Sequence, residues 1–109
     1  MRARGTRSGK PAVRESALVA AIVEKLRATP GLVVRKRHGT AWGIAGDPDL
    51  TGCYLGRHFE LEVKTPAGAL TRLQEARLAE WARVGAITAV VRSVSEALAA
   101  LGIEEGAQR

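Results

Sequence analysis

The chain has 109 residues, 46% of them hydrophobic and 26% charged, a composition typical of one globular domain with a modest core. It contains no apolar run long enough for a membrane span and no secretory signal region at its start, so we expect neither a membrane contact nor export. Its single cysteine, Cys53, excludes an intramolecular disulfide and favours a cytoplasmic location. The net charge of +6 favours a polyanionic partner.

Much of the positive charge lies at the N-terminus. Residues 1–10 contain four basic side chains and no acid, which leaves 13 basic and 11 acidic side chains, or +2, for the rest. The four are Arg2, Arg4, Arg7 and Lys10. We expect a flexible basic tail over 1–12, a folded domain over 13–102 and a flexible end over 103–109. The tail either follows a DNA backbone electrostatically or is only a solvated terminus, and the sequence favours neither.

The first predicted element is a helix from Arg14 to about Ala28, ended by a Thr-Pro-Gly sequence. Its apolar stripe consists of Leu18, Ile22 and Leu26. Glu15 falls on the same stripe, which is uncommon for a solvated acid. It is either a first-turn acid that the helix dipole favours or a carboxylate directed into a site.

A strand is predicted over Leu32–Arg37, followed by a glycine-rich loop over 38–47. Its basic end supplies candidate phosphate contacts, namely Arg35, Lys36, Arg37 and His38. Trp42, within the loop, either stacks on a nucleic-acid base or packs the loop against the body. The packing interpretation is slightly favoured.

A hairpin follows, with strands over Leu50–Tyr54 and His58–Lys64 and a tight turn between them. With a two-residue turn, residues whose numbers sum to 111 face each other, so Asp49 lies opposite Glu62. Directly opposed residues have Cβ atoms about 4.5–5.5 Å apart, which suits two carboxylates that share one divalent cation.

Side chains of the second strand alternate, so Phe59, Leu61 and Val63 are predicted to face the core. His58, Glu60, Glu62 and Lys64 take the other face, where Lys64 can reach a phosphate or an attacking water. The common alternative is a solvated Glu/Lys face without catalytic function. Cys53, His58 and Glu60 also lie close enough to hint at a transition-metal site, but a structural cysteine and a surface histidine are the favoured interpretation.

A helix is predicted over Thr71–Val84, a strand over Ala86–Arg92 and a final helix from Ser93 to about Gly102. Thr71 and Gln74 form a capping-box pattern. Gln74 also shares a helix face with Leu78 and Trp81, so it can look toward the strand that carries Lys64.

Four sequence motifs together resemble the VRR-NUC family of the PD-(D/E)xK nuclease superfamily, most closely its small stand-alone bacterial and phage-type members. The resemblance covers about residues 14–101, with the motifs in the family's order. They are Glu15 on an opening helix, Gly46-x-Pro48-Asp49-Leu50, Leu61-Glu62-Val63-Lys64, and Gly68-Ala69-Leu70-Thr71-x-x-Gln74.

The resemblance implies an α/β fold with a restriction-endonuclease-like αβββαβα core and cleavage of DNA that requires Mg²⁺ or Mn²⁺. It implies metal ligands from Asp49, Glu62 and the Val63 carbonyl, with Glu15 as a direct or water-mediated ligand. It also implies catalytic roles for Lys64 and an assisting role for Gln74. The chain departs from the motif at Asp47, an extra acid beside the site.

We therefore expect a metal-dependent endonuclease that prefers branched or junction DNA. The alternatives are a non-catalytic DNA-binding module and a module of the same fold that recruits a larger nuclease. By the resemblance we also expect a homodimer, since two active sites can address two symmetric strands. Candidate apolar contacts are Trp81, Val94, Leu98 and Leu101, although each is more readily explained as ordinary core.

Overall fold

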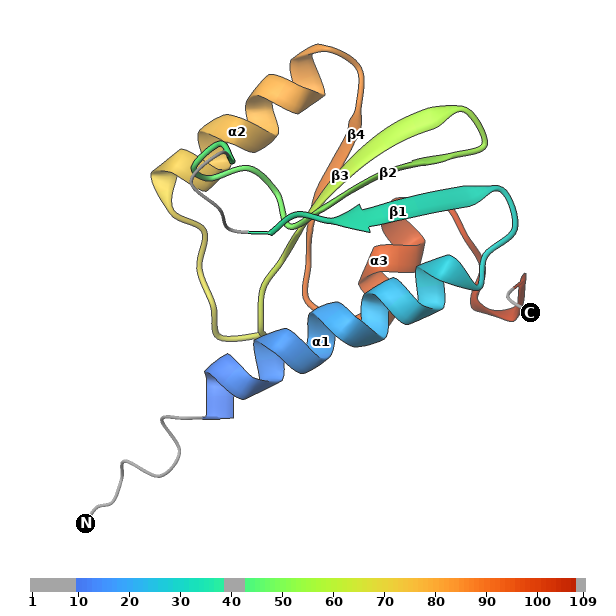
Figure 1. Ribbon diagram of the computed structural model, residues 1–109, viewed down its shortest axis with the longest axis horizontal. Helices are drawn as coiled ribbons and strands as arrows, with labels where there is room; N and C mark the ends of the chain where they lie inside the picture. The colour runs from blue at the N-terminus through green and yellow to red at the C-terminus, as the bar shows by residue number, and fades with distance from the viewer. Residues whose placement is uncertain (1–9, 39–42, 108–109) are drawn as a thin grey trace.

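A computed structural model describes residues 10–38 and 43–107 (Figure 1). The basic tail over 1–9 and Trp42 lie outside these residues, so the expectations for them stay predictions. The elements follow the predicted αβββαβα order. They are α1 (Lys10–Arg27), β1 (Leu32–Lys36), β2 (Leu50–Tyr54), β3 (Arg57–Val63), α2 (Arg72–Arg83), β4 (Ile87–Val91), α3 (Val94–Ala100) and a short 3₁₀ turn (Glu105–Ala107).

The first helix begins earlier than predicted, at Lys10 rather than Arg14, so it includes residues 10–12 that were assigned to the tail. Pro11 is compatible with this start because proline lacks only an N–H that the first helical turn leaves unused. None of the helices in the described part of the chain is long and apolar enough to cross a membrane.

The four strands form one mixed sheet in the order β1-β2-β3-β4. β1, β2 and β3 are antiparallel neighbours, and β4 lies parallel to β3. The β2–β3 turn has positive φ at both Leu55 (49°) and Gly56 (86°), as a two-residue hairpin turn with the twist of the strands requires. Leu50 pairs with Leu61 and Cys53 with His58, so the predicted register is confirmed.

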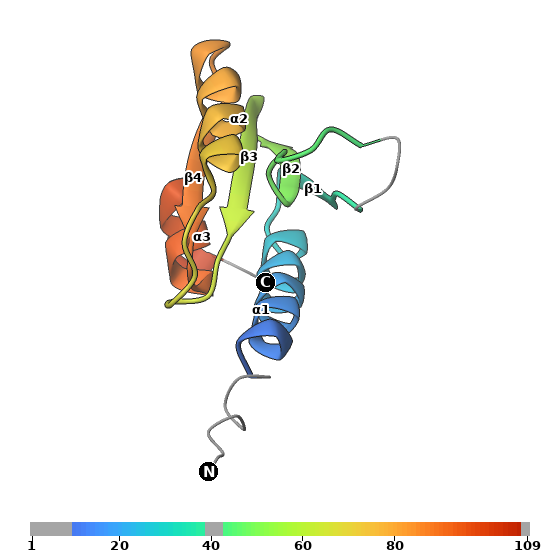
Figure 2. The ribbon, with the colours of Figure 1, turned by 90° about the vertical axis from the view of Figure 1, so that its left-hand side faces the viewer.

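The hydrophobic core lies between one face of the sheet and the helices α1 and α3, which contact each other. Phe59, Leu61 and Val63 are fully buried there, as the alternation predicts. α2 lies on the opposite side of the strands and contributes no fully buried residue (Figure 1). The N-terminal turns of α1 extend past the end of the sheet in both views (Figures 1 and 2).

The second face of β3 differs from the solvated Glu/Lys surface that the alternation allows. Glu60 is 0% exposed and Glu62 is 2% exposed, so two acids are buried on this face. α2 and the loop before β2 lie on this side of the sheet, joined by bonds from Trp81 to Asp47 and from Arg77 to the Ala45 carbonyl. Both acids therefore need compensating partners or shifted protonation.

The C-terminal residues differ from prediction in one respect. Ile103, assigned to a flexible end, is buried in the core. Leu98 and Leu101 are also buried there, so they are part of the monomer's own core and present no dimer surface. Ser93 caps α3 by accepting the Glu96 N–H, and Gly102, with φ of 74°, ends the helix so that the chain returns to the core.

Candidate active site

Asp49 closes the turn that leads into β2, and two backbone contacts fix it. The Arg37 N–H donates to the Asp49 carbonyl oxygen at 2.8 Å, which continues the β1–β2 pairing. The Val63 N–H donates to Asp49 Oδ2, also at 2.8 Å. Because Val63 directly follows Glu62, this bond holds the Asp49 carboxylate next to the Glu62 side chain. The structure therefore brings together the two carboxylates that the hairpin register pairs.

Glu62 has an incomplete set of partners. Its Oε2 atom lies 3.7 Å from Lys64 Nζ. Its Oε1 atom is buried and has no hydrogen-bond partner among the described residues. A buried carboxylate oxygen without a donor costs folding free energy, so such an atom in a native structure requires an explanation, for example an ion or a water molecule.

The pKa of Glu62 is raised from 4.5 to about 7. Burial is the largest cause, because it removes the water that stabilises the ionised form, and repulsion by Asp49 is the second. Lys64 lowers the pKa, whereas a hydrogen bond with Asp49 and the charge of Glu15 raise it further. The carboxyl therefore keeps its proton to a higher pH than an ordinary glutamic acid does. Strongly perturbed carboxyl groups of this kind are concentrated at functional sites.

The other predicted site residues differ in how they relate to the carboxylate pair. The Lys64 side chain is 13% exposed, and its ammonium group lies beside Glu62, directly after the end of β3. Glu15 is half-buried on α1 and acts on Glu62 through its charge. Gln74 lies in a complete capping box: its Oε1 accepts the Thr71 N–H at 3.0 Å, and its N–H donates to Thr71 Oγ1 at 3.1 Å. Its side chain is therefore engaged in the cap.

Two carboxylates make only part of a metal site. No group of three or more His, Cys, Asp or Glu side chains in the described ranges is arranged to hold an ion. The suggested cluster of Cys53, His58 and Glu60 is not among such groups either: His58 contacts Glu60, but Glu60 is also bonded to Arg37 and Thr51, and Cys53 is exposed. Hard divalent cations such as Mg²⁺ are commonly bound by one or two carboxylates together with backbone carbonyls, water and substrate phosphate. The Asp49–Glu62 pair, with its unpartnered oxygen, fits such a cation.

Basic residues line a groove beside this site. The groove runs between α1 and the edge strand β1 and has a volume of about 540 Å³. Its basic side chains are Arg27, Arg35, Lys36 and His38, and Glu24 is its only acid among the described residues. His38 also lines a pocket of about 300 Å³ that includes Asp49. The basic groove along the edge of the sheet therefore meets, at His38, the pocket that contains Asp49.

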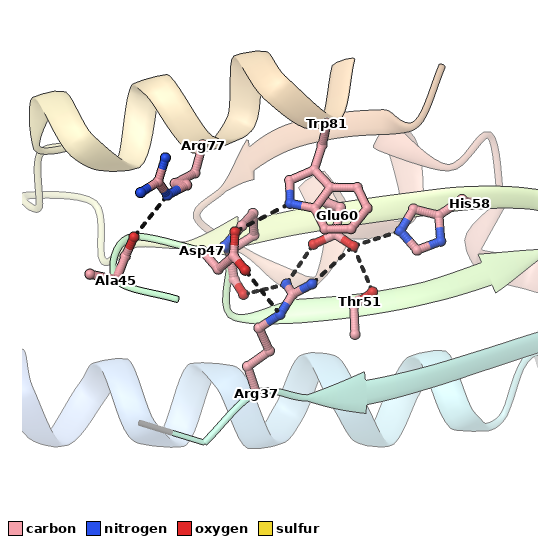
Figure 3. Close-up of polar contacts among 9 residues, drawn as sticks. Arg37, Ala45, Asp47, Thr51, His58, Glu60, Arg77 and Trp81 are labelled. Atoms are coloured by element: carbon pink, nitrogen blue, oxygen red, sulfur yellow. Dashed lines mark hydrogen bonds and ion pairs between the residues drawn. The ribbon is translucent and has the colours of Figure 1, made fainter. Parts of the chain in front are cut away.

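Arg37, predicted as a phosphate contact, has a different environment. Its guanidinium group donates to the Glu60 carboxylate and to the Pro48 carbonyl, and it lies over the Trp81 ring (Figure 3). Most of its donors are therefore used within the protein. The side chain faces the polar network around Glu60 instead of the groove.

A solved structure described as a VRR_NUC domain protein superimposes on the chain with a TM-score of 0.60 and 17% sequence identity. The match covers 80% of this chain and 84% of that one. This chain has a VRR_NUC-like fold. No protein-family model and no curated protein matches it. The likeness concerns the fold, and it confirms the restriction-endonuclease-like α/β architecture that the motifs imply.

Three site features were missed by the sequence analysis. Arg27 contributes to the basic groove from the end of α1, and Glu60 and Trp81 form a polar network beside the carboxylate pair. The alternation of β3 already placed Glu60 on the same face as Glu62. His58, one of its partners, lies two residues earlier on the same strand, but Arg37 and Thr51 come from the segment after β1 and from β2, and no local sequence pattern connects these two to Glu60.

Proposed function

We propose that this protein is a nuclease that uses a divalent cation to hydrolyse DNA phosphodiester bonds. The observation that carries the proposal is the buried Glu62 carboxylate, which lies beside Asp49 with one oxygen that has no partner in residues 10–38 and 43–107. The VRR_NUC-like fold supports the same conclusion, since that fold positions these residues at the end of a central hairpin.

The charge balance favours a bound cation over a purely structural role. Burial and mutual repulsion of Asp49 and Glu62 disfavour two ionised carboxylates, as the raised pKa of Glu62 indicates. A DNA-binding surface with no metal would also be weakened by them. We propose that Asp49 and Glu62 hold Mg²⁺ or Mn²⁺, with the Val63 carbonyl as a further oxygen donor and Glu15 acting through a bound water. When bound, the cation supplies Lewis-acid chemistry that activates water and offsets charge on the phosphate.

Lys64 is proposed to act on the substrate directly. Its ammonium group is 3.7 Å from Glu62 and remains 13% exposed, so it can contact both the site and a phosphate. There it orients the attacking water by hydrogen bonding and stabilises negative charge that develops on the phosphate oxygens. Gln74 assists only when its side chain leaves the helix cap, so we assign it a secondary role.

The basic groove is proposed to hold the phosphate backbone of the flanking DNA. Arg27, Arg35 and Lys36 are exposed along it, and His38 connects it to the pocket at Asp49. We further propose a homodimer that prefers branched DNA, because one site cuts one strand per encounter. With Leu98 and Leu101 in the monomer core, such a dimer must use other surfaces.

The test compares junction, nicked and linear DNA, each incubated with Mg²⁺, Mn²⁺ or EDTA. We expect cleavage only with the cations and at least a hundredfold slower cleavage by Lys64→Ala, because removing one transition-state contact typically costs two to three powers of ten. Lys25→Ala, in the last turn of α1, is the matched control and should cut at the wild-type rate. Wild-type protein that binds DNA without cutting would instead support the non-catalytic DNA-binding alternative.

A further inference from the structure

Arg37 is joined to three consecutive residues of the turn that ends in Asp49. Its backbone N–H donates to the Asp49 carbonyl and its Nη1 to the Pro48 carbonyl, both at 2.8 Å. Its Nε lies 3.8 Å from Asp47 Oδ2. Arg37, directly after β1, therefore contacts Asp49 through its backbone and Pro48 and Asp47 through its side chain, which Figure 3 shows pointing toward Asp47.

Glu60 holds the Arg37 guanidinium in place. Nη1 donates to Glu60 Oε1 at 2.5 Å and Nη2 to Oε2 at 3.3 Å. Thr51 Oγ1 and His58 Nε2 each lie 2.6 Å from Glu60 Oε2. Because the Glu60 side chain is 0% exposed, loss of Arg37 leaves a buried charge without its main counterion. The planar fork of arginine also allows a bidentate contact that lysine cannot reproduce.

The same turn is attached to α2 on its other side. Trp81 Nε1 donates to Asp47 Oδ1 at 3.3 Å, and Arg77 Nε donates to the Ala45 carbonyl at 3.0 Å. Trp81 also stacks on His58, with ring centroids 5.1 Å apart, and Arg37 lies 5.5 Å above the Trp81 ring centroid. The turn is thus held between Arg37 on one side and α2 on the other. Side chains other than Asp49 and Glu62 therefore determine the position of the turn.

We propose that Arg37, held by Glu60, is a positioning residue that keeps the Asp49 carboxylate opposite Glu62. This inference rests on the proposed function at one point only, the role of Asp49 as a metal ligand. Residues that orient metal ligands typically change metal affinity or activity by about 10- to 100-fold when they are replaced. Arg37 acts through the turn, and its effect on metal binding requires Asp49.

The test uses Arg37→Lys, which keeps the charge and removes the fork. The first measurement is amide hydrogen exchange of Val63, whose N–H donates to Asp49 Oδ2 in the metal-free protein. We expect faster Val63 exchange in the variant. The second is calorimetric titration with Mn²⁺ alone, where we expect about tenfold weaker binding, the lower end of the range for residues that orient ligands. Arg92→Lys is the matched control, because Arg92 Nη1 also donates to two backbone carbonyls, those of Thr65 and Gly68, but on the segment after Lys64. Val63 exchange and Mn²⁺ affinity should both stay at the wild-type values in this variant.

A double-mutant cycle with Asp49→Asn separates positioning from a direct effect. If Arg37 acts through Asp49, Arg37→Lys causes no further loss of Mn²⁺ affinity in the Asp49→Asn protein. Unchanged Val63 exchange in Arg37→Lys, or equal Mn²⁺ losses in both backgrounds, overturns the positioning role. Wild-type protein that binds no Mn²⁺ overturns the proposed function alone, because the Val63 measurement still decides whether Arg37 positions Asp49.

Discussion

Replacing Glu62 with glutamine is expected to stabilise the metal-free protein at neutral pH. Glutamine has nearly the shape of a protonated glutamic acid, and it removes the charge that burial and Asp49 disfavour. Its amide can also donate a hydrogen bond to the Asp49 carboxylate, which the ionised Glu62 cannot do. A substitution at a proposed metal ligand should therefore raise the free energy of unfolding.

The pH dependence of this effect has a defined sign. The pKa of Glu62 is about 7 in the folded protein and is taken as 4.5 in the unfolded chain. Between these values the folded state binds more protons, so the free energy of unfolding falls as pH rises. One pKa unit corresponds to about 1.4 kcal/mol, so the Glu62 contribution lost across this window is about 3 kcal/mol. Glutamine does not titrate and loses none of it.

Urea unfolding in EDTA at several values between pH 4.5 and pH 8 measures this difference. We expect Glu62→Gln and wild type to be similar near pH 4.5 and to diverge progressively up to pH 7–8. Taking the difference between the two proteins cancels the titration of groups that do not interact with Glu62, so what is left reports Glu62 and the groups coupled to it, Asp49 above all. Glu75→Gln, at an exposed position in the first turn of α2, should follow the wild-type curve. Parallel curves for wild type and Glu62→Gln would refute the raised pKa.

Three further outcomes are expected. In a urea titration, Gly46→Ala should lower the free energy of unfolding by at least about 1–2 kcal/mol, because Gly46 has φ of 84° and a Cβ there would lie 2.6 Å from Leu73 Cγ. Gly106→Ala is the control: it has open space around it and should be nearly neutral in the same titration. Thr71→Ala should cost about 1 kcal/mol through loss of the capping box, and an unchanged unfolding midpoint would contradict that role. Light scattering at micromolar concentration should report a dimer, whereas a mass near 11.6 kDa would exclude it.

The sequence by itself determined the features that depend on neighbouring residues. The turn at Leu55-Gly56 fixed the hairpin register, because a two-residue turn leaves only one pairing. That register alone placed Asp49 opposite Glu62. The caps at Thr71 and Ser93 were likewise predictable, since each consists of a side chain and a backbone N–H three residues apart.

Only the tertiary structure decided which of these residues are buried and what they contact. Alternation along β3 assigned Glu60 and Glu62 to one face, but it carries no information about what covers that face. Both acids are buried where segments distant in the chain meet β3, with Arg37 on Glu60 and Asp49 beside Glu62. The same packing raised the pKa of Glu62 and turned Arg37 from a predicted phosphate contact into a partner of Glu60. The local sequence pattern decides on which face of a strand a side chain lies, whereas desolvation and charge pairing arise only where separate elements pack together.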